Sequence, residues 1–214
     1  MSTASVEAPS SGLPQQQPAG SQELPPPDQF GASRVFGAAM VILGAIGLYF
    51  SGLIMFDKIV LMQDPTFTPA CTLNSIVSCT DVMASPQASA FGFPNPFIGL
   101  VGFPIIITMG LTLLSRGQFP RWMWWGLTIG LGVGVVFVHW LAYSAIFTIG
   151  ALCLYCMAVW AVMLALFIMV LVHTVRESAR AQGKDVASGI AQPAVVLAAW
   201  YVGFAVVIWQ HFFF

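Results

Sequence analysis

The chain has 214 residues, of which 58% are hydrophobic and only 7% carry a charge. Soluble domains have about 25% charged and about 45–50% apolar residues, so this composition excludes an ordinary soluble protein and predicts an integral membrane protein. The 7 Lys and Arg residues nearly balance the 8 Asp and Glu residues, so nothing in the composition indicates binding to nucleic acid.

The N-terminal segment, residues 1–33, is rich in Pro, Ser, Gln and Gly and contains almost no aliphatic side chains. Such a segment cannot bury enough apolar surface to offset the entropy of ordering, so we predict a disordered tail. It also lacks the basic region and apolar core of a signal peptide. The first apolar segment is therefore expected to be an uncleaved anchor.

Five apolar segments are long enough to cross a bilayer, which takes about 20 predominantly apolar residues. They are residues 36–56, 97–114, 123–147, 151–172 and 193–213. The third and fourth are nearly continuous, and Gly150 is the expected break in a tight helical hairpin. We predict an all-α integral membrane protein with five crossings, in which residues 57–96 form the loop between the first and the second.

The basic residues predict the orientation, because cytoplasmic loops carry an excess of Lys and Arg. If the five segments alternate in direction, the tail, the 115–121 link and the 176–192 loop lie on one side, together with six of the seven Lys and Arg residues. Lys58, in the opposite loop, is the exception. We therefore predict a cytoplasmic N-terminus and an outer C-terminus.

All four cysteines fall on the predicted outer side, where disulfides form and persist. Cys71 and Cys79 lie in the loop, and Cys153 and Cys156 open the fourth segment as "CLYC". The "CLYC" thiols share one helix face and lie in the first turn, where free backbone N–H groups stabilise a thiolate. This pattern favours a redox pair beside a lipid-soluble electron carrier; the alternative is two small buried apolar residues.

The loop pair, "CTLNSIVSC", has three interpretations. The three are a static structural disulfide, one half of a four-cysteine zinc site, and a redox pair that exchanges with the helix pair. The zinc site is disfavoured because it would set one ligand pair into a membrane helix. Two pairs on one side favour a relay, in which the loop pair meets a soluble partner and the helix pair meets the membrane interior.

The order of these motifs resembles the vitamin K epoxide reductase family. The matching features are Cys71-x7-Cys79, Ser85 six residues later, "FGFPNPFIGLVGF" with Asn95, and the Cys153–Cys156 motif at the start of the fourth segment. The resemblance covers roughly residues 36–175. It implies a four-helix core over residues 34–175 around a quinone site, a loop (57–96) that caps one end with a short helix, and a fifth helix (193–214) outside the core. The DsbB family also uses four cysteines and a quinone, but its C-x-x-C motif precedes its loop pair, whereas here the loop pair comes first.

The resemblance implies a role for each cysteine. Cys71 would exchange with a thioredoxin-like (DsbA-like) partner outside the cytoplasm, and Cys79 would pass the electrons to Cys153. Cys156 would face a membrane quinone, either menaquinone or ubiquinone, inside the four-helix bundle. The chain would then be a quinone-dependent thiol oxidoreductase that supports disulfide formation.

Three further residues are assigned to the quinone site by the same resemblance. Ser85 and Asn95 would hydrogen-bond the quinone oxygens, and the alternatives are a turn residue and a helix cap. Trp160 stands where the vertebrate enzyme has Tyr, four residues after the second active cysteine. A Trp offers a flat face to a ring but donates from an indole N–H, which favours quinone reduction over epoxide reduction.

The expected setting is a bacterial inner membrane, with the active site on the extracytoplasmic side. Many bacterial relatives continue into a fused thioredoxin-like domain; this chain ends at Phe214, so a separate donor protein is expected. Two other functions stay open: vitamin K epoxide reduction proper, and a non-catalytic membrane protein with structural disulfides. His139, inside the third segment, is either a neutral hydrogen-bonding side chain or a proton relay.

Overall fold

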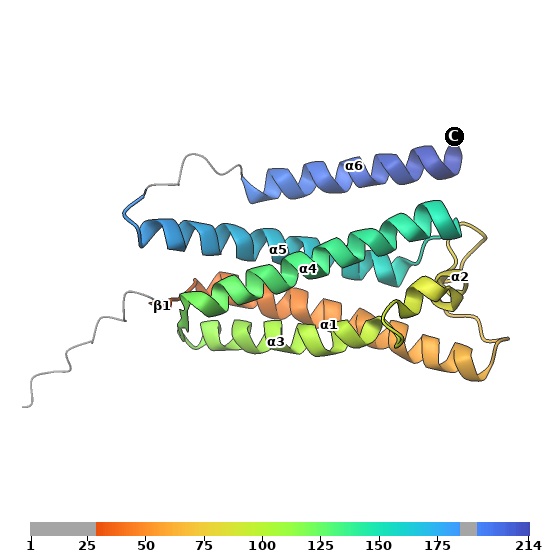
Figure 1. Ribbon diagram of the computed structural model, residues 1–214, viewed down its shortest axis with the longest axis horizontal. Coiled ribbons are helices and arrows are strands. Elements are labelled where there is room, and N and C mark those ends of the chain that lie inside the picture. The colour runs from red at the N-terminus through yellow and green to blue at the C-terminus, as the bar shows by residue number, and fades with distance from the viewer. Residues whose placement is uncertain (1–28, 185–191) are drawn as a thin grey trace, which may run out of the picture.

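The structure is a computed structural model that describes residues 29–184 and 192–214 and consists almost entirely of helices. Within these residues, five helices are long and apolar enough to cross a membrane. They are α1 (Arg34–Gln63), α3 (Pro96–Leu114), α4 (Arg121–Ser144), α5 (Leu154–Arg180) and α6 (Pro193–Phe213). All five run along the long axis of the molecule (Figure 1). The predicted fold class, an all-α membrane protein, is confirmed.

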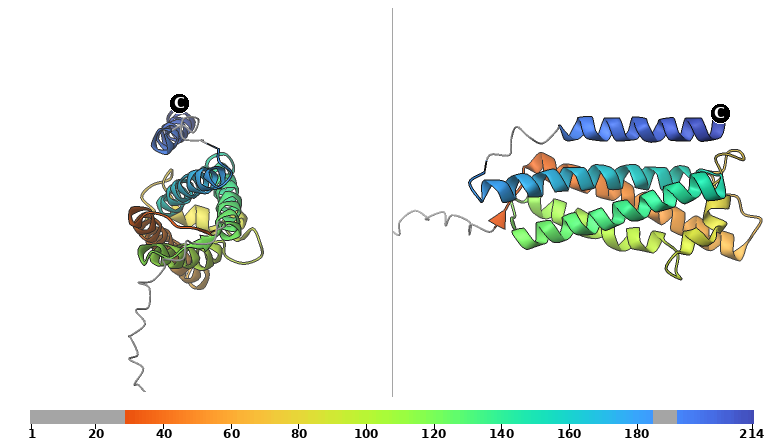
Figure 2. Two further views of the ribbon diagram at one scale, coloured as in Figure 1. Left: turned by 90° about the vertical axis from the view of Figure 1, so that its left-hand side faces the viewer. Right: turned by 45° about the horizontal axis from the view of Figure 1, so that its top comes forward.

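Four of these helices form a bundle, in which α1 packs on α3 and α5, and α4 packs on α5. Figure 2 shows this bundle end-on, with α6 set apart from the other four. Helix α6 contacts α5 and has no buried residue. The predicted four-helix core with a fifth helix outside it is therefore present.

Helices α1 and α3 approach closely because glycines line their contact. A Cβ atom at Gly37 would lie 2.9 Å from the carbonyl oxygen of Gly110, and one at Gly47 would lie 2.2 Å from the ring of Phe103. In lipid, where burial of apolar surface does not drive helices together, such close packing stabilises their association. This pair of helices forms one rigid wall of the bundle.

The loop between α1 and α3 covers one end of the bundle and contains a short helix, α2 (Cys79–Ala84), followed by a 3-10 turn, Pro86–Ser89. Ser78 begins α2, because its side-chain oxygen accepts a hydrogen bond from the N–H of Asp81 at 3.2 Å. The loop starts later than predicted: α1 continues to Gln63, so Asp57 and Lys58 are helical and buried. The sequence prediction ended α1 at Phe56, but the helix continues through the polar residues Asp57 and Lys58, whose side chains its neighbours cover.

The junction between α4 and α5 is as tight as predicted. A π-helical turn, Ala145–Ile149, ends at Gly150, whose φ of 73° lies in the left-handed region that glycine adopts most readily. Helix α5 then begins at Leu154 with Cys153 as its N-cap. The "CLYC" motif therefore occupies the first turn of a helix, as predicted.

At the opposite end, β1 (Gln29–Phe30) pairs with β2 (Phe119–Pro120) in a short antiparallel ladder. The buried carbonyl oxygen of Phe30 accepts a hydrogen bond from the indole N–H of Trp124 at 3.1 Å. Sequence analysis included residues 29–33 in a disordered tail, whereas these contacts order them. Residues 1–28 lie outside the described part of the chain, as do residues 185–191 of the predicted 176–192 loop, whose first residues extend α5 to Arg180.

Candidate active site

Three cysteine sulfurs meet at the capped end of the bundle. Cys71 and Cys79 form a disulfide with their Cα atoms 5.7 Å apart, and the Sγ atoms of Cys79 and Cys153 are 3.3 Å apart. The Sγ atoms of all three residues lie within 4.8 Å of one another. Cys153 and Cys156 are free thiols. The loop pair and the helix pair, distant in sequence, therefore form one site.

A backbone contact brings the two pairs together. Val77 and Leu152 form a parallel bridge, and the N–H of Leu152 donates to the carbonyl of Ile76 at 2.7 Å. On the loop, Cys79 lies two residues after Val77 of this bridge. On the other segment, Cys153 lies one residue after Leu152, directly before α5. The bridge thus fixes the two cysteines against each other in a way that their spacing along the chain does not reveal.

Cys153 is placed to exchange with the loop disulfide. The backbone N–H of Cys156 donates to its Sγ atom at 3.4 Å, as expected for an N-cap side chain. The hydrogen bond from the Cys156 thiol lowers the pKa of Cys153 below the ordinary 9.0, and backbone N–H groups add to this effect. Burial and the nearby charge of Asp57 oppose it. A lowered thiol pKa makes a sulfur a better leaving group in disulfide exchange, and Cys153 already contacts Cys79 of the loop disulfide.

The loop disulfide is covered rather than exposed. Cys71 is 3% exposed and Cys79 is fully buried, whereas Cys156 is half-buried. A soluble partner can therefore reach Cys71 only if the capping loop moves. The disulfide also argues against the zinc interpretation, because zinc is bound by thiolates and two of the four sulfurs are joined to each other.

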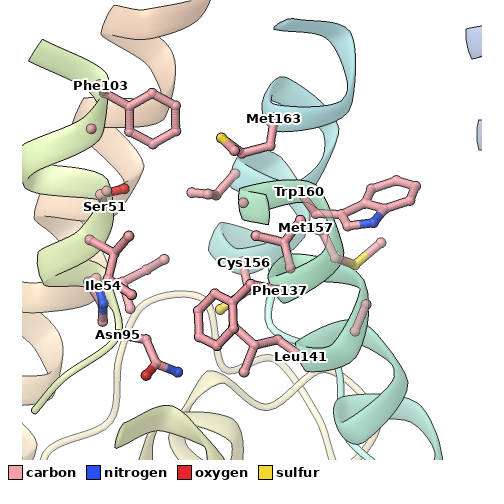
Figure 3. A pocket seen from close by; sticks show the side chains of 18 of the residues that line it. Ser51, Ile54, Asn95, Phe103, Phe137, Leu141, Cys156, Met157, Trp160 and Met163 are labelled. Carbon is pink, nitrogen blue, oxygen red and sulfur yellow. The ribbon is translucent and has the colours of Figure 1, made fainter. Parts of the chain in front are cut away.

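Below the sulfurs lies a cavity of about 550 Å³, lined by α1, α3, α4, α5 and the capping loop. Cavities of about 300–1,000 Å³ with apolar walls and a few polar groups are typical of small-molecule sites. Figure 3 shows Cys156 at the cavity, with Phe137 and Met157 on its side and Ser51 and Ile54 across from it. The cavity therefore offers an apolar chamber with a thiol in its wall.

One side of this cavity is loosely closed. Helices α3 and α4 border it but make little contact with each other. Gly102 of α3 and Gly126 and Gly130 of α4 line the cavity with open space where a Cβ atom would be. An elongated apolar molecule can therefore extend from the cavity toward the surrounding lipid between these two helices.

The sequence profile of the vitamin K epoxide reductase family matches residues 38–171, well over half of the chain. The chain belongs to this family. Enzymes of the vitamin K epoxide reductase family are quinone-dependent thiol–disulfide oxidoreductases. That activity accounts for two cysteine pairs that converge above an apolar cavity. No individually curated protein matches the chain.

Two residues that the family resemblance assigned to the quinone, Ser85 and Asn95, line this cavity. The hydroxyl of Ser85 donates to the carbonyl of Val82 at 2.7 Å. The side-chain oxygen of Asn95 accepts from the N–H of Ala90 at 3.0 Å, and its amide nitrogen donates to the carbonyl of Gln87 at 2.7 Å. Both side chains therefore also shape the capping loop, and their contact with a quinone stays a prediction.

The third such residue, Trp160, lines the cavity but turns its ring toward α6, away from Ser51 in Figure 3. Its ring stacks on Phe204 with centroids 4.3 Å apart. Its N–H donates to Nε2 of His139 at 3.3 Å, and the N–H of Trp200 donates to the same atom at 3.0 Å. Nδ1 of His139 lies 2.7 Å from the carbonyl oxygen of Val135, so it carries the ring proton. This arrangement favours the hydrogen-bonding interpretation of His139 over a proton relay.

Lys58 and Phe204 are among the cavity-lining residues that sequence reasoning did not assign to the site. Lys58 carries a signal in the sequence, because it is the one basic residue on the predicted outer side. Phe204 carries no such signal in the sequence, because it is one aromatic residue among several in α6. Its role depends on how α6 is rotated against α5, and an apolar helix in lipid has no polar face to indicate that rotation.

Proposed function

We propose that this enzyme reoxidises a thioredoxin-like (DsbA-like) dithiol protein outside the cytoplasm and delivers the electrons to a membrane quinone. It thereby supports disulfide-bond formation. The observation that carries this proposal is the 3.3 Å separation between the Sγ atoms of Cys79 and Cys153. Thiol–disulfide exchange proceeds through a mixed disulfide between adjacent sulfurs, and these are the two sulfurs that must join for electrons to pass between the pairs.

The exchange steps follow from the positions of the sulfurs. A thiolate of the donor protein attacks Cys71, and the Cys71–Cys79 disulfide opens. The freed Cys79 then attacks Cys153 in the oxidised helix pair and releases the Cys156 thiolate. The second thiol of the donor then attacks the donor–Cys71 mixed disulfide, so that the donor leaves in its oxidised form and Cys71 is freed. Attack of Cys71 on Cys79 restores the loop disulfide and leaves Cys153 reduced. The observed pairing, with a loop disulfide and two free helix thiols, corresponds to the end of this sequence.

The final step returns the helix pair to its oxidised form. The Cys153–Cys156 dithiol closes to a disulfide, and its two electrons and two protons convert a bound quinone to quinol. Cys156 would face the ring, and Ser85 and Asn95 would border its oxygens. The quinone would be menaquinone or ubiquinone, and the gap between α3 and α4 suits the isoprenoid tail of either.

The proposed orientation places the sulfur cluster outside the cytoplasm, in a bacterial inner membrane. Support comes from the distribution of charge, since Arg34, Arg116 and Arg121 lie at the ends of helices opposite the capping loop (Figure 1). These residues suit the cytoplasmic side of a membrane. The cluster then occupies the oxidising compartment in which disulfides persist.

Reconstitution tests this function. The purified protein in liposomes receives a reduced thioredoxin-like donor and either menaquinone or ubiquinone, and quinol formation is followed by absorbance. We expect quinol to form in proportion to the donor thiols oxidised, and Cys156→Ser to abolish it. Normal quinol formation by Cys156→Ser would contradict the assigned roles. A parallel reaction with a quinone epoxide tests whether the epoxide is also a substrate.

A further inference from the structure

Lys58 is a buried cation in the wall of the cavity. Its side chain is 6% exposed, and it is the only charged residue among the described residues that line the cavity. The one ion pair found within residues 29–184 and 192–214 joins Arg180 to Glu177, so Lys58 has no carboxylate partner there. A buried charge without a partner is costly, and in a membrane protein it indicates a function.

Hydrogen-bond capacity distinguishes Lys58 from Ser85 and Asn95. An ammonium group has three N–H donors, and only one is used, by the carbonyl of Met83 at 3.0 Å. The single hydroxyl proton of Ser85 is taken by Val82, and Asn95 retains one free N–H. Lys58 therefore brings two unused donors to this end of the cavity, together with the only positive charge among the described residues that line it.

We propose that Lys58 is a further catalytic residue, which donates a hydrogen bond to a quinone oxygen and stabilises the negative charge that develops there. This inference rests on the proposed quinone reduction by the Cys153–Cys156 dithiol. Positive groups fixed beside developing charge in a water-poor site lower the barrier substantially. The dithiol supplies both electrons and both protons, so Lys58 keeps its own proton through the cycle. The role also explains why a basic residue stands on the outer side.

A purely structural role is the competing explanation, because the bond to Met83 ties α1 to the end of α2. Two substitutions separate the roles. Lys58→Gln keeps an N–H donor for Met83 but removes the charge, and Lys58→Arg keeps the charge. Lys184→Met, at an exposed position at the other end of α5, controls for loss of a lysine.

Binding is measured in a Cys156→Ser background, in which turnover is blocked. Menadione or a short-chain ubiquinone is titrated against each variant, and quenching of tryptophan fluorescence reports binding because Trp160 lines the cavity. Hydrogen bonds to charged groups contribute about 1.5–3 kcal/mol, so we expect Lys58→Gln to weaken binding roughly tenfold or more. We expect Lys58→Arg to recover most of the affinity and Lys184→Met to match the parent.

Turnover and stability complete the test. With the native cysteines present, we expect Lys58→Gln to lower kcat by roughly 100-fold, as for loss of one transition-state donor, with a smaller change in KM. Its thermal midpoint without quinone should stay near that of the parent. Unchanged affinity and kcat in Lys58→Gln would overturn the proposal, as would losses that parallel a fall in thermal midpoint. Failure of the unsubstituted enzyme to reduce quinone would instead refute the proposed function.

Discussion

At the scale of single residues, the two thiols of "CLYC" differ because of where the helix begins. Cys153 is the N-cap, and its sulfur contacts Cys79 of the loop disulfide. Cys156, one turn further, lies on α5 beside the cavity (Figure 3). One thiol is therefore in contact with the loop pair, and the other borders the cavity.

The hydrogen bond between these thiols sets the ionisation of Cys153. Its pKa lies below 9.0 chiefly because the Cys156 thiol donates to it, so the thiolate should persist to lower pH than in an ordinary cysteine. We expect Cys156→Ala to raise the pKa of Cys153, because the donor is lost. Cys156→Ser should keep it lowered, because a hydroxyl still donates.

The measurement is the rate of Cys153 modification by a small thiosulfonate reagent, followed by mass spectrometry across a pH range that brackets 9.0. In both variants the loop pair remains a disulfide, so Cys153 is the only free native thiol. The midpoint of the rate profile should lie at higher pH in the Ala variant than in the Ser variant. Identical midpoints would show that the thiol hydrogen bond does not control Cys153.

Among the site residues, the sequence predicted those whose role depends on local spacing. The positions of Cys153 and Cys156 in a first helical turn follow from their separation and from Gly150. The 3.3 Å contact between Cys79 and Cys153 does not, because it depends on a bridge between segments that are far apart in sequence. Lys58 was assigned to a loop, since the prediction ended α1 at its last apolar residue.

At the scale of helices, α6 is held to the bundle by polar contacts on an otherwise apolar surface. Trp200 donates to His139 of α4, and the hydroxyl of Tyr201 donates to the carbonyl of Ala161 on α5 at 2.7 Å. Phe204 stacks on Trp160 beside them. These contacts fix the rotation of α6 and bring Phe204 to the cavity.

Replacing Trp200 tests this attachment. Trp200→Phe removes one hydrogen bond to His139 and keeps an aromatic ring, so we expect a loss of about 0.5–1.5 kcal/mol in the free energy of unfolding. Trp209→Phe, on the same helix and 57% exposed, serves as the control and should change little. Unfolding in detergent micelles, followed by circular dichroism, measures both. Equal stability of the two variants would show that the Trp200–His139 bond does not hold α6.

The contact between α1 and α3 gives a second prediction at this scale. A methyl group at Gly47 would lie 2.2 Å from the ring of Phe103, whereas one at Gly52 has nothing within 4 Å. Overpacking typically costs about 1–3 kcal/mol, so Gly47→Ala should destabilise the fold. Gly52→Ala should be neutral or stabilising, because alanine favours a helix. The same unfolding measurement compares them, and a Gly47→Ala variant as stable as Gly52→Ala would contradict this packing.

Helix positions were predictable from the sequence because hydropathy and length decide them in lipid. The ends of the helices were less predictable from the sequence. α1 reaches Gln63 and α5 reaches Arg180, beyond their apolar runs, because helical hydrogen bonding continues into the polar boundary of a membrane. The order of Gln29–Phe30 was also missed, since only the tertiary contact with Trp124 stabilises that segment.

At the scale of the whole molecule, the reacting sulfurs and the arginine-rich helix ends lie at opposite ends of the bundle. Single-cysteine labelling tests the proposed orientation. Pro65→Cys, exposed beside the capping loop, should react with a membrane-impermeant maleimide added to intact cells. Lys184→Cys, exposed at the other end, should react only after the membrane is opened. The reverse pattern would place the sulfur cluster in the cytoplasm and exclude the proposed partner.

The passage of electrons from the loop pair to the helix pair is tested most directly by trapping its intermediate. In the Cys71→Ala, Cys156→Ala double variant, only Cys79 and Cys153 remain, with sulfurs that lie 3.3 Å apart in the native protein. Under mild oxidation, mass spectrometry of proteolytic fragments should detect a Cys79–Cys153 disulfide in most molecules. Two unlinked thiols under these conditions, in a variant that remains folded, would contradict the relay.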